Sequence, residues 1–272
     1  MHVAGLFLYP VKSLRGFAVA SAMLDRFGFV GDRRFLVVDG DGRFLTQRAL
    51  PRMALIETAL TPCELVLRAP HGGSCAVPLH AGRGAEPTLR VAIWRDTVEA
   101  EDCGVEAAVW LSEILRQPCR LVRLGPAYHR PVNPARAEPG DEVTFADAFP
   151  LLTLSEASLA ELNARLIARG QAAVPMNRFR PNLVLAGATA YAEDSLTRFR
   201  AGEGVFRAGG GCARCVVITT DQLTGTREAE PLRTLAGYRR DPADSTRVLF
   251  GQNLVHETKT GIVRVGDQVV PL

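Results

Sequence analysis

The sequence predicts an α+β protein that is rich in β-structure, with barrel-like sheets and flanking helices. Short apolar runs separated by turn residues fill the first 60 residues, and the two Asp-Gly pairs at residues 39–42 favour a hairpin. Only two stretches have apolar residues at helical spacing, and strand signals return after the second. No G-x-G-x-x-G or G-x-x-x-x-G-K-[ST] pattern joins a strand to a helix, so neither a Rossmann site nor a P-loop is indicated.

Size and composition are those of an ordinary globular protein. The chain has 272 residues, of which 47% are hydrophobic and 22% charged, and its net charge is +3. So small a charge does not indicate nucleic-acid binding, and six cysteines are too few for a disulfide scaffold. No apolar run approaches the roughly 18 residues that span a bilayer, and no targeting segment is evident. We expect no nucleic-acid partner, no membrane span and a cytoplasmic location.

Strand signals are spread over the chain. In the first half they cover residues 3–8, 18–24, 34–38, 44–46, 54–60, 91–93, 97–100 and 119–124. In the second half they cover residues 183–186, 216–220, 254–255 and 263–265. The chain begins with strands alone and continues with strands and one or two long helices. This order is typical of α+β proteins rather than of βαβ alternation.

Two helices and one division of the chain are expected. The helices lie near 104–116, ended by Pro118, and near 156–169, where Ser155 is a good N-cap. Segment 125–140 holds four prolines and little apolar material, so it is a boundary or a mobile loop. We expect two intertwined parts, a β-rich domain over 1–90 and a second domain over 91–272 that contains both helices.

The most distinctive motif is Gly209-Gly210-Gly211-Cys212-Ala213-Arg214-Cys215. Glycines let the backbone approach a ligand closely. The cysteine pair leaves four interpretations open. They are a zinc site, which lacks a second ligand pair; a redox pair, which should open a helix rather than a β-branched strand; two packed thiols; or one thiolate that binds a soft metal or cofactor centre.

Three clusters are suited to hold an anion. They are Tyr9-Pro10-Val11-Lys12-Ser13, Asp32-Arg33-Arg34 and Asn177-Arg178-Phe179-Arg180-Pro181-Asn182. Arginine binds phosphate through paired charge-assisted hydrogen bonds, whereas lysine acts as a point charge. Each cluster alone is more typical of a solvated face or a salt bridge. Together with a glycine-flanked cysteine they fit one phosphate-bearing ligand that carries a soft metal.

Seven motifs in order carry a family resemblance. They are Tyr9-Pro10-Val11-Lys12-Ser13, Gly31-Asp32-Arg33, Trp94-Arg95-Asp96 with Asp102-Cys103-Gly104, Leu154-Ser155-Glu156-Ala157-Ser158-Leu159, Phe179-Arg180-Pro181-Asn182, Cys212-Ala213-Arg214-Cys215 and Phe250-Gly251-Gln252-Asn253. On these motifs the whole chain resembles MOSC-domain proteins with a MOSC N-terminal β-barrel, the group of the mitochondrial amidoxime-reducing component and its bacterial relatives. The resemblance implies an N-terminal MOSC β-barrel-like domain and a MOSC β-barrel domain with flanking helices.

The resemblance also implies a molybdenum cofactor (Mo-molybdopterin), a pterin with a dithiolene and a terminal phosphate. It implies that Cys215 is the metal ligand and the catalytic residue. The other positions implied around the cofactor are Lys12, Ser13, Arg33, Asp147, Ala148, Phe149, Arg180, Asn182, Ala213, Arg214 and Asn253. Arg34 and Arg178 match less clearly and are salt-bridge candidates, and Cys212 is expected to be a packed thiol.

The implied function is that of a molybdoenzyme that reduces N-hydroxylated compounds such as amidoximes and hydroxylamines. The cofactor is expected between the two parts of the chain, with Asp147 considered as proton donor. Electrons are expected from a separate protein, either ferredoxin-like or a cytochrome or flavin reductase, because no ferredoxin or haem motif occurs in this sequence. The alternative is a cofactor carrier, or an insertion or sulfur-handling protein, without reductase activity.

Overall fold

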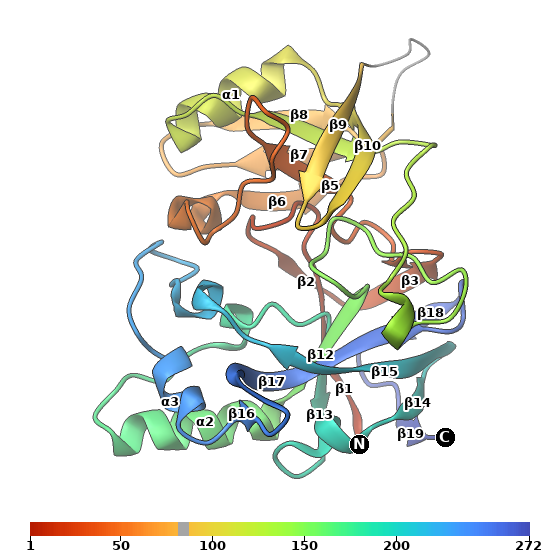
Figure 1. The fold of residues 1–272 in the computed structure, drawn as a ribbon, viewed down its shortest axis with the longest axis vertical. Helices are drawn as coiled ribbons and strands as arrows, with labels where there is room; N and C mark the ends of the chain where they lie inside the picture. Colours follow the sequence, from red (N-terminus) through yellow and green to blue (C-terminus); the bar gives the residue numbers. More distant parts are fainter. Residues whose placement is uncertain (81–86) are drawn as a thin grey trace.

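A computed structural model describes residues 1–80 and 87–272. Figure 1 shows two bodies along the long axis, with helix α1 at one end and helix α2 at the other. The three described helices are α1 (Val105–Leu115), α2 (Glu156–Ala168) and α3 (Leu232–Ala236). We call the body that contains α1 the small body and the body that contains α2 the large body.

The large body is built on a nine-stranded sheet (Figure 1). Its main path runs β19 (Val269–Pro271), β14 (Arg198–Ala201), β15 (Gly204–Ala213), β17 (Asp244–His256), β12 (Leu151–Ser155), β13 (Leu183–Ala186), β1 (His2–Leu8) and β2 (Phe17–Val19), and β16 (Arg240–Asp241) pairs with β17. Strands β12 and β13 are parallel. Helix α2 supplies the crossover between them, because parallel neighbours cannot be joined by a tight turn.

The small body holds two sheets. One has the order β5 (Phe35–Val38), β11 (Arg120–Leu124), β10 (Asp96–Asp102) and β9 (Thr88–Ile93), and the other has β6 (Glu57–Leu60), β7 (Glu64–Arg68) and β8 (Ser74–Pro78). Strands from both sides of residue 90 therefore share one sheet. The boundary expected near residue 90 falls inside β9, where the hairpin pairing to β10 continues from Asp96↔Ile93 to Glu101↔Thr88.

The start of the chain belongs to both bodies. Strand β1 pairs with β13 of the large body, and β3 (Ser21–Asp25) pairs with β18 (Ile262–Arg264) and β4 (Gly28–Phe29). In contrast, Val11 and Leu14 are fully buried in the core of the small body. The loop between them is therefore held at the junction of the two bodies, which is where its polar residues can meet side chains from the far end of the sequence.

Both expected helices form within their predicted ranges, and the Ser155 hydroxyl caps α2 by accepting a hydrogen bond of 3.1 Å from the Ser158 amide. The strand expected over 216–220 is wrong. The segment Val216–Thr219 is a 3₁₀ helix, in which the Thr219 hydroxyl donates to the Val216 carbonyl. The β-branched residues follow a strand instead of forming one, because β15 ends at Ala213 and the local preference yields to the turn that packs Ile218 in the core.

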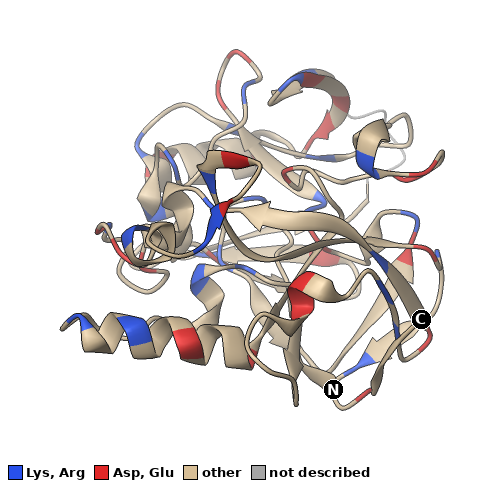
Figure 2. Cartoon of the chain, turned by 60° about the horizontal axis from the view of Figure 1, so that its bottom comes forward, with Lys and Arg blue, Asp and Glu red and all other residues tan. Residues whose placement is uncertain are grey.

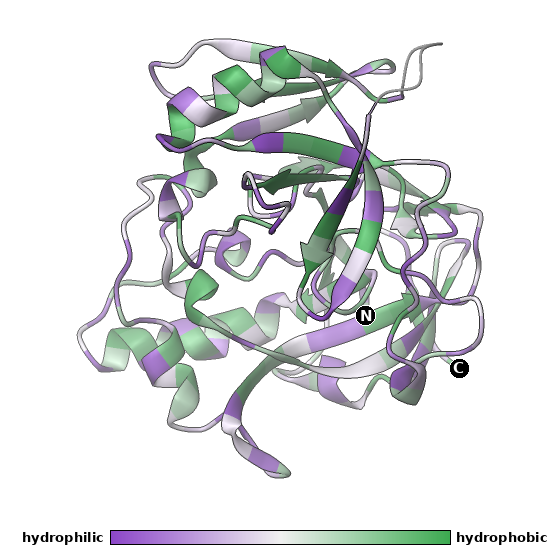
Figure 3. Cartoon of the chain, turned by 45° about the horizontal axis from the view of Figure 1, so that its top comes forward, coloured by the Kyte–Doolittle hydropathy of each residue, from purple (hydrophilic) through white to green (hydrophobic). Residues whose placement is uncertain are grey.

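The strand expected over residues 44–46 is also wrong, because Phe44 forms only an isolated bridge to Val38. In Figure 3, hydrophobic colour covers much of the strands and alternates with hydrophilic colour along the helices. Figure 2 shows acidic and basic residues interspersed over the helices and loops, in keeping with the small net charge. Within the described residues, no helix is both long and apolar enough to cross a membrane.

Candidate functional site

One pocket lies where the two bodies meet, and every site residue expected from the motifs lines it. These residues are Lys12, Ser13, Arg33, Asp147, Ala148, Phe149, Arg180, Asn182, Ala213, Arg214, Cys215 and Asn253. Arg48, Arg178 and Cys212 line the same pocket. The pocket therefore gathers residues from the first loop of the chain, from the segment before β12, from the segment before β13 and from the end of β15.

A buried tyrosine organises two of the cations. The Tyr9 ring lies 4.6 Å from the Arg33 guanidinium carbon and 4.3 Å from that of Arg180. Its hydroxyl donates to the Pro181 carbonyl at 3.1 Å. Burial raises the pKa of Tyr9 to about 12, so the phenol stays neutral and keeps this donor role. The aromatic ring thus orients two arginines at one wall of the pocket.

Arg33 is held by a dense set of acceptors. Its Nη1 donates to Asp32 Oδ2 at 2.6 Å and to Asn182 Oδ1 at 2.7 Å, and its Nη2 donates to the Arg180 carbonyl at 3.2 Å. Ser13, Arg33 and Arg180 all have positive φ, at 67°, 47° and 55°. Non-glycine residues adopt this conformation at a cost that the surrounding contacts must offset, and such positions are concentrated at functional sites.

Arg180 is the second arginine on the Tyr9 ring. Its Nη1 donates to the Leu14 carbonyl at 2.7 Å. Burial lowers its pKa to about 10. At neutral pH the guanidinium therefore remains charged in the pocket wall.

Lys12 is a nearly buried cation paired with Asp147. Its Nζ donates to Asp147 Oδ1. Burial lowers the pKa of Lys12 to about 8, although the Asp147 carboxylate opposes this shift. For Asp147, desolvation favours the neutral acid, but Lys12, Arg48 and the Trp94 indole outweigh it and hold the pKa of the carboxyl well below its ordinary value. Asp147 is thus a carboxylate at neutral pH, which makes it unsuited to the role of proton donor.

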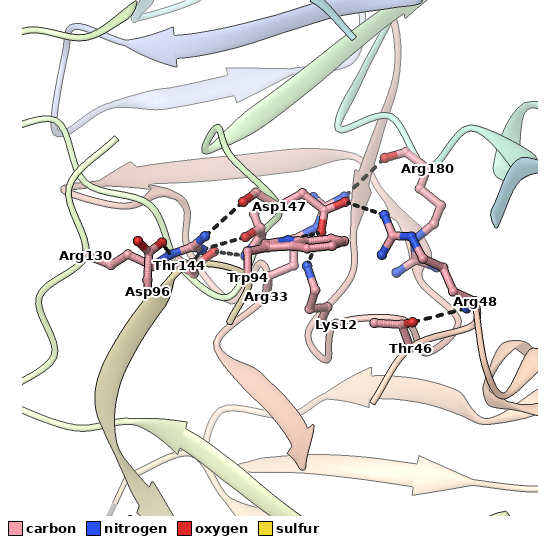
Figure 4. Close-up of polar contacts among 11 residues, drawn as sticks. Lys12, Arg33, Thr46, Arg48, Trp94, Asp96, Arg130, Thr144, Asp147 and Arg180 are labelled. Carbon is pink, nitrogen blue, oxygen red and sulfur yellow. Dashed lines mark hydrogen bonds and ion pairs between the residues drawn. The ribbon is translucent and has the colours of Figure 1, made fainter. Parts of the chain in front are cut away.

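The loop that carries Asp147 is held by Arg130, a residue that the motifs do not reveal. The Arg130 guanidinium is almost fully buried and donates to the carbonyls of Thr144, Ala146 and Asp147 at 2.9, 2.6 and 2.9 Å. Its Nε donates to Asp96 of the β9–β10 hairpin at 2.6 Å. Arg130 therefore ties the pocket loop to the small body (Figure 4).

Both cysteines of the motif are free thiols. Cys215 is half-buried at the N-terminus of the 3₁₀ turn, and burial raises the pKa of Cys212. Across residues 1–80 and 87–272, no group of three or more His, Cys, Asp or Glu side chains could hold a metal ion together. The cysteine pair lies at the end of β15 and precedes a helical turn, contrary to the context expected from the sequence, but that turn is four residues long.

The residues beside the thiol are held by the neighbouring strands. Arg214 Nε donates to the Phe250 carbonyl at 2.7 Å and its Nη1 to the Phe179 carbonyl at 2.9 Å. Its Nη2 is buried with no hydrogen-bond partner among the described residues. We call residues 209–211 of β15 the glycine strand. Asn253 Nδ2 donates to the Gly210 carbonyl at 3.1 Å and so helps to hold the glycine strand in place. A buried donor without a partner is costly unless a ligand accepts from it.

Both arginines that the sequence offered as salt-bridge candidates form ion pairs. Arg34 pairs with Asp25 and Arg178 pairs with Asp221, each at 2.7 Å. The sequence reasoning did not single out Arg48 or Arg130. Both are arginines in an arginine-rich chain, and only burial and partners distinguish them from solvated ones.

Comparisons with known proteins identify the two domains of the chain. Family models match the chain as a MOSC N-terminal beta barrel domain over residues 1–118 and as a MOSC domain over residues 140–270. The chain is 36% identical to mitochondrial amidoxime-reducing component 1 of Mus musculus, with 98% of this chain and 81% of that protein covered. The identity to the Homo sapiens protein of the same name is also 36%, with 98% and 82% covered.

A second kind of relative is longer. The chain is 32% identical to the molybdenum cofactor sulfurase of Oryza sativa subsp. japonica, a match that covers 100% of this chain and 35% of that protein. Two domain matches that together span most of the chain, and relatives above 30% identity along nearly all of it, point to one family. This protein belongs to the MOSC family and combines a MOSC N-terminal β-barrel domain with a MOSC domain.

Proposed function

We propose that this protein binds the molybdenum cofactor in the pocket between its two bodies and reduces N-hydroxylated compounds such as amidoximes and hydroxylamines. The observation that carries the proposal is that Cys215 lines the same pocket as the cations Lys12, Arg33 and Arg180. A soft sulfur donor and a group of cations in one pocket suit a molecule that has a soft metal at one end and a phosphate at the other.

The residues present fit such a group. A terminal phosphate carries a charge of about −1.5 to −2 near neutral pH, which Lys12, Arg33 and Arg180 would offset. The unpartnered Nη2 of Arg214, next in sequence to Cys215, supplies a buried donor that a ligand would satisfy. Bound there, the cofactor would supply the two-electron chemistry that removes oxygen from an N–O bond.

The protein's own side chains hold and orient what binds. Asp147, kept ionised, fixes the Lys12 ammonium at the wall of the pocket. Asn182 fixes the Arg33 guanidinium in the same way. Cys215 serves as the protein ligand to the metal, and a single protein ligand leaves other coordination positions open for substrate.

The relatives support the same proposal, since the names of the mouse and human proteins describe amidoxime reduction by a mitochondrial component. We propose that a separate redox protein, either ferredoxin-like or a cytochrome or flavin reductase, supplies the electrons. An acidic docking face on that protein would complement the arginine-lined pocket mouth. We further propose a cytoplasmic location, in keeping with the low cysteine content of six in 272 residues.

Metal and pterin analysis of the purified protein tests the proposal. We expect about one molybdenum per chain in the wild type, since the pocket holds one soft ligand set, and loss of the metal in Cys215→Ala. Cys63→Ala is the matched control, because Cys63 is an exposed thiol outside the pocket. Equal molybdenum in Cys215→Ala and the control would contradict the assignment of the ligand.

The second candidate is a carrier or sulfur-handling protein, and the resemblance to a molybdenum cofactor sulfurase favours it. Both functions need the same pocket, so turnover separates them. With reduced viologen as electron donor, a reductase converts benzamidoxime to benzamidine, whereas a carrier retains the cofactor and leaves the amidoxime unchanged.

A further inference from the structure

An exposed tryptophan stands at the rim of the pocket. Trp94 lies at the turn between β9 and β10 with a φ of +57°, and it is 49% exposed. The edge-to-face contact with Phe44 has a centroid distance of 5.0 Å. The indole N–H donates to Asp147 Oδ1 at 3.2 Å. Two contacts therefore fix the orientation of an indole that is about half exposed to solvent.

The face of this indole is covered by a guanidinium group. The Arg48 guanidinium carbon lies 4.5 Å from the Trp94 ring, and Arg48 Nη2 lies 3.7 Å from Asp147 Oδ2. That separation is an ion pair but is too long for a direct hydrogen bond. Figure 4 shows Arg48, Trp94 and Asp147 together at the pocket, with Lys12 on the carboxylate.

The two carboxylate oxygens of Asp147 differ. Oδ1 accepts from both Lys12 Nζ and Trp94 Nε1. Among the described residues, Oδ2 has Arg48 as its charged neighbour and accepts no hydrogen bond from it. The side chain of Asp147 is 59% exposed. An ionised oxygen beside an oriented aromatic face is therefore available to a ligand.

Arg48 can leave this position without loss of its backbone contacts. Its amide donates to Thr46 Oγ1 at 3.1 Å, and its carbonyl accepts from Arg227 Nη1 at 3.0 Å. Its guanidinium contacts are the indole face and the distant carboxylate oxygen. The main chain is anchored while the charged end is loosely held, as expected of a side chain that a competing group can displace.

We propose that the Trp94 face and the Asp147 carboxylate form a binding site for a planar, delocalised nitrogen cation of the guanidinium or amidinium class, which Arg48 fills when no ligand is bound. A guanidinium group stacks on an aromatic face and pairs with a carboxylate through parallel N–H bonds, two contacts that a compact ammonium cannot make together. The Arg48 side chain itself ends in a guanidinium group, and it occupies the position that we assign to the ligand.

The consequence for substrate choice rests on the proposed function. An N-hydroxyguanidine carries such a planar group next to its N–O bond, whereas hydroxylamine carries none. Trp94 and Asp147 would hold the planar group at the pocket mouth and direct the N–O bond into the pocket. Trp94 is then a specificity-determining residue that favours planar substrates over hydroxylamine.

Binding is tested first, in a measurement that does not depend on turnover. Methylguanidinium chloride is titrated into the full-length protein and the tryptophan fluorescence followed, with methylammonium chloride as the non-planar cation of the same charge. Trp110 donates to the Gly72 carbonyl in the small body and contributes a constant background. We expect methylguanidinium to bind more tightly than methylammonium, and Arg48→Met to tighten it by about threefold or more because the competing group is gone.

Arg26→Met is the matched control, since Arg26 also covers an aromatic ring, that of Phe27, but lies outside the pocket. Equal affinity for the two cations, or an affinity that Arg48→Met leaves unchanged or weakens, would overturn the proposed site. An effect of the same size in Arg26→Met would overturn it as well.

Measurements of turnover supply the second test of the proposal. Stacking of a cation on an exposed aromatic ring corresponds to a factor of about 2–5 in affinity. Trp94→Leu should therefore raise KM for an N-hydroxyguanidine by about that factor relative to KM for hydroxylamine. An equal change for both substrates would refute the specificity role. If the wild type reduces neither substrate while methylguanidinium still binds, the proposed function fails and the binding site stands.

Discussion

The amide oxygen of Asn182, a fully buried residue, accepts a hydrogen bond of 2.7 Å from the Arg33 guanidinium. The same oxygen accepts from the Leu152 amide at 3.3 Å, and the Asn182 Nδ2 donates to the Phe7 carbonyl at 3.2 Å. Asn182 thus fastens a pocket cation to strands of the nine-stranded sheet. It acts on a ligand through Arg33, as a positioning residue.

Replacement of Asn182 by alanine should therefore leave the Arg33 guanidinium less firmly held and lower the stability of the fold. A buried group left without its partner costs about 1–3 kcal/mol, so we expect the free energy of unfolding to fall by roughly that amount. Urea denaturation measures this, and pterin content after purification measures the effect on the pocket. Asn163→Ala is the control, because Asn163 makes two comparable hydrogen bonds to Val174 outside the pocket. Equal pterin loss in both variants would count against the positioning role.

Arg130 offers a second test of how the pocket is held. Arg130→Gln removes donors to three carbonyls of the loop 144–147, so we expect a loss of about 2–4 kcal/mol in the free energy of unfolding. The released loop should also bind the cofactor less well. Thermal and urea unfolding measure the first effect and metal analysis the second. Arg26→Gln, at an exposed arginine, should leave both within error, and a similar result for Arg130→Gln would contradict this account.

The glycine strand allows a matched pair of substitutions. A Cβ at Gly209 would lie 2.4 Å from Phe149 Cε1, whereas one at Gly211 would lie 3.1 Å from Leu249 Cδ1, the far end of a flexible side chain. We expect Gly209→Ala to displace Phe149 from the pocket and to cost about 1–3 kcal/mol of stability, and Gly211→Ala to cost less. Urea denaturation and cofactor content of the two variants provide the comparison. The reverse order of effects would show that Phe149 is free to move.

The ammonium of Lys12 predicts a pH dependence. Burial lowers its pKa to about 8 in the folded protein, below the ordinary lysine value of 10.5 that applies to the unfolded chain. Between those values the unfolded chain binds more protons, so this group makes the fold more stable as pH rises from about 8 to 10.5. Anion binding changes in the opposite sense, because the pocket loses a positive charge over the same interval.

Calorimetric titration with inorganic pyrophosphate measures the second effect. We expect the affinity of the wild type to fall as pH rises through about 8, and that of Lys12→Arg to change less, because arginine keeps its charge. Parallel pH profiles for the two proteins would assign the dependence to other groups.

The fold class and most elements follow from the pattern of apolar runs. Ser155 predicted the start of α2, since an N-cap side chain acts on amides three residues away. The expectation of a strand over 216–220 was wrong, because β-propensity depends on the surface against which a segment packs. Within residues 1–80 and 87–272, Val216–Thr219 joins no sheet and packs Ile218 into the core as a 3₁₀ turn. Residue 90 was expected to separate two domains, but the hydrogen-bonding register places it inside a hairpin of the small body.

Local motifs by themselves indicated several of the residues that line the pocket: Lys12 and Ser13 after β1, Arg33 and Arg180, and Cys215 after β15. The tertiary structure alone decided what holds them. The contacts of Arg130 with loop 144–147 and the stacking of Arg48 on Trp94 join segments that carry no mutual signal in the sequence. The sequence gives the charge of an arginine but does not distinguish it from the other arginines of the chain. Its role depends on its burial and on the partners that the fold brings within a few ångströms of it.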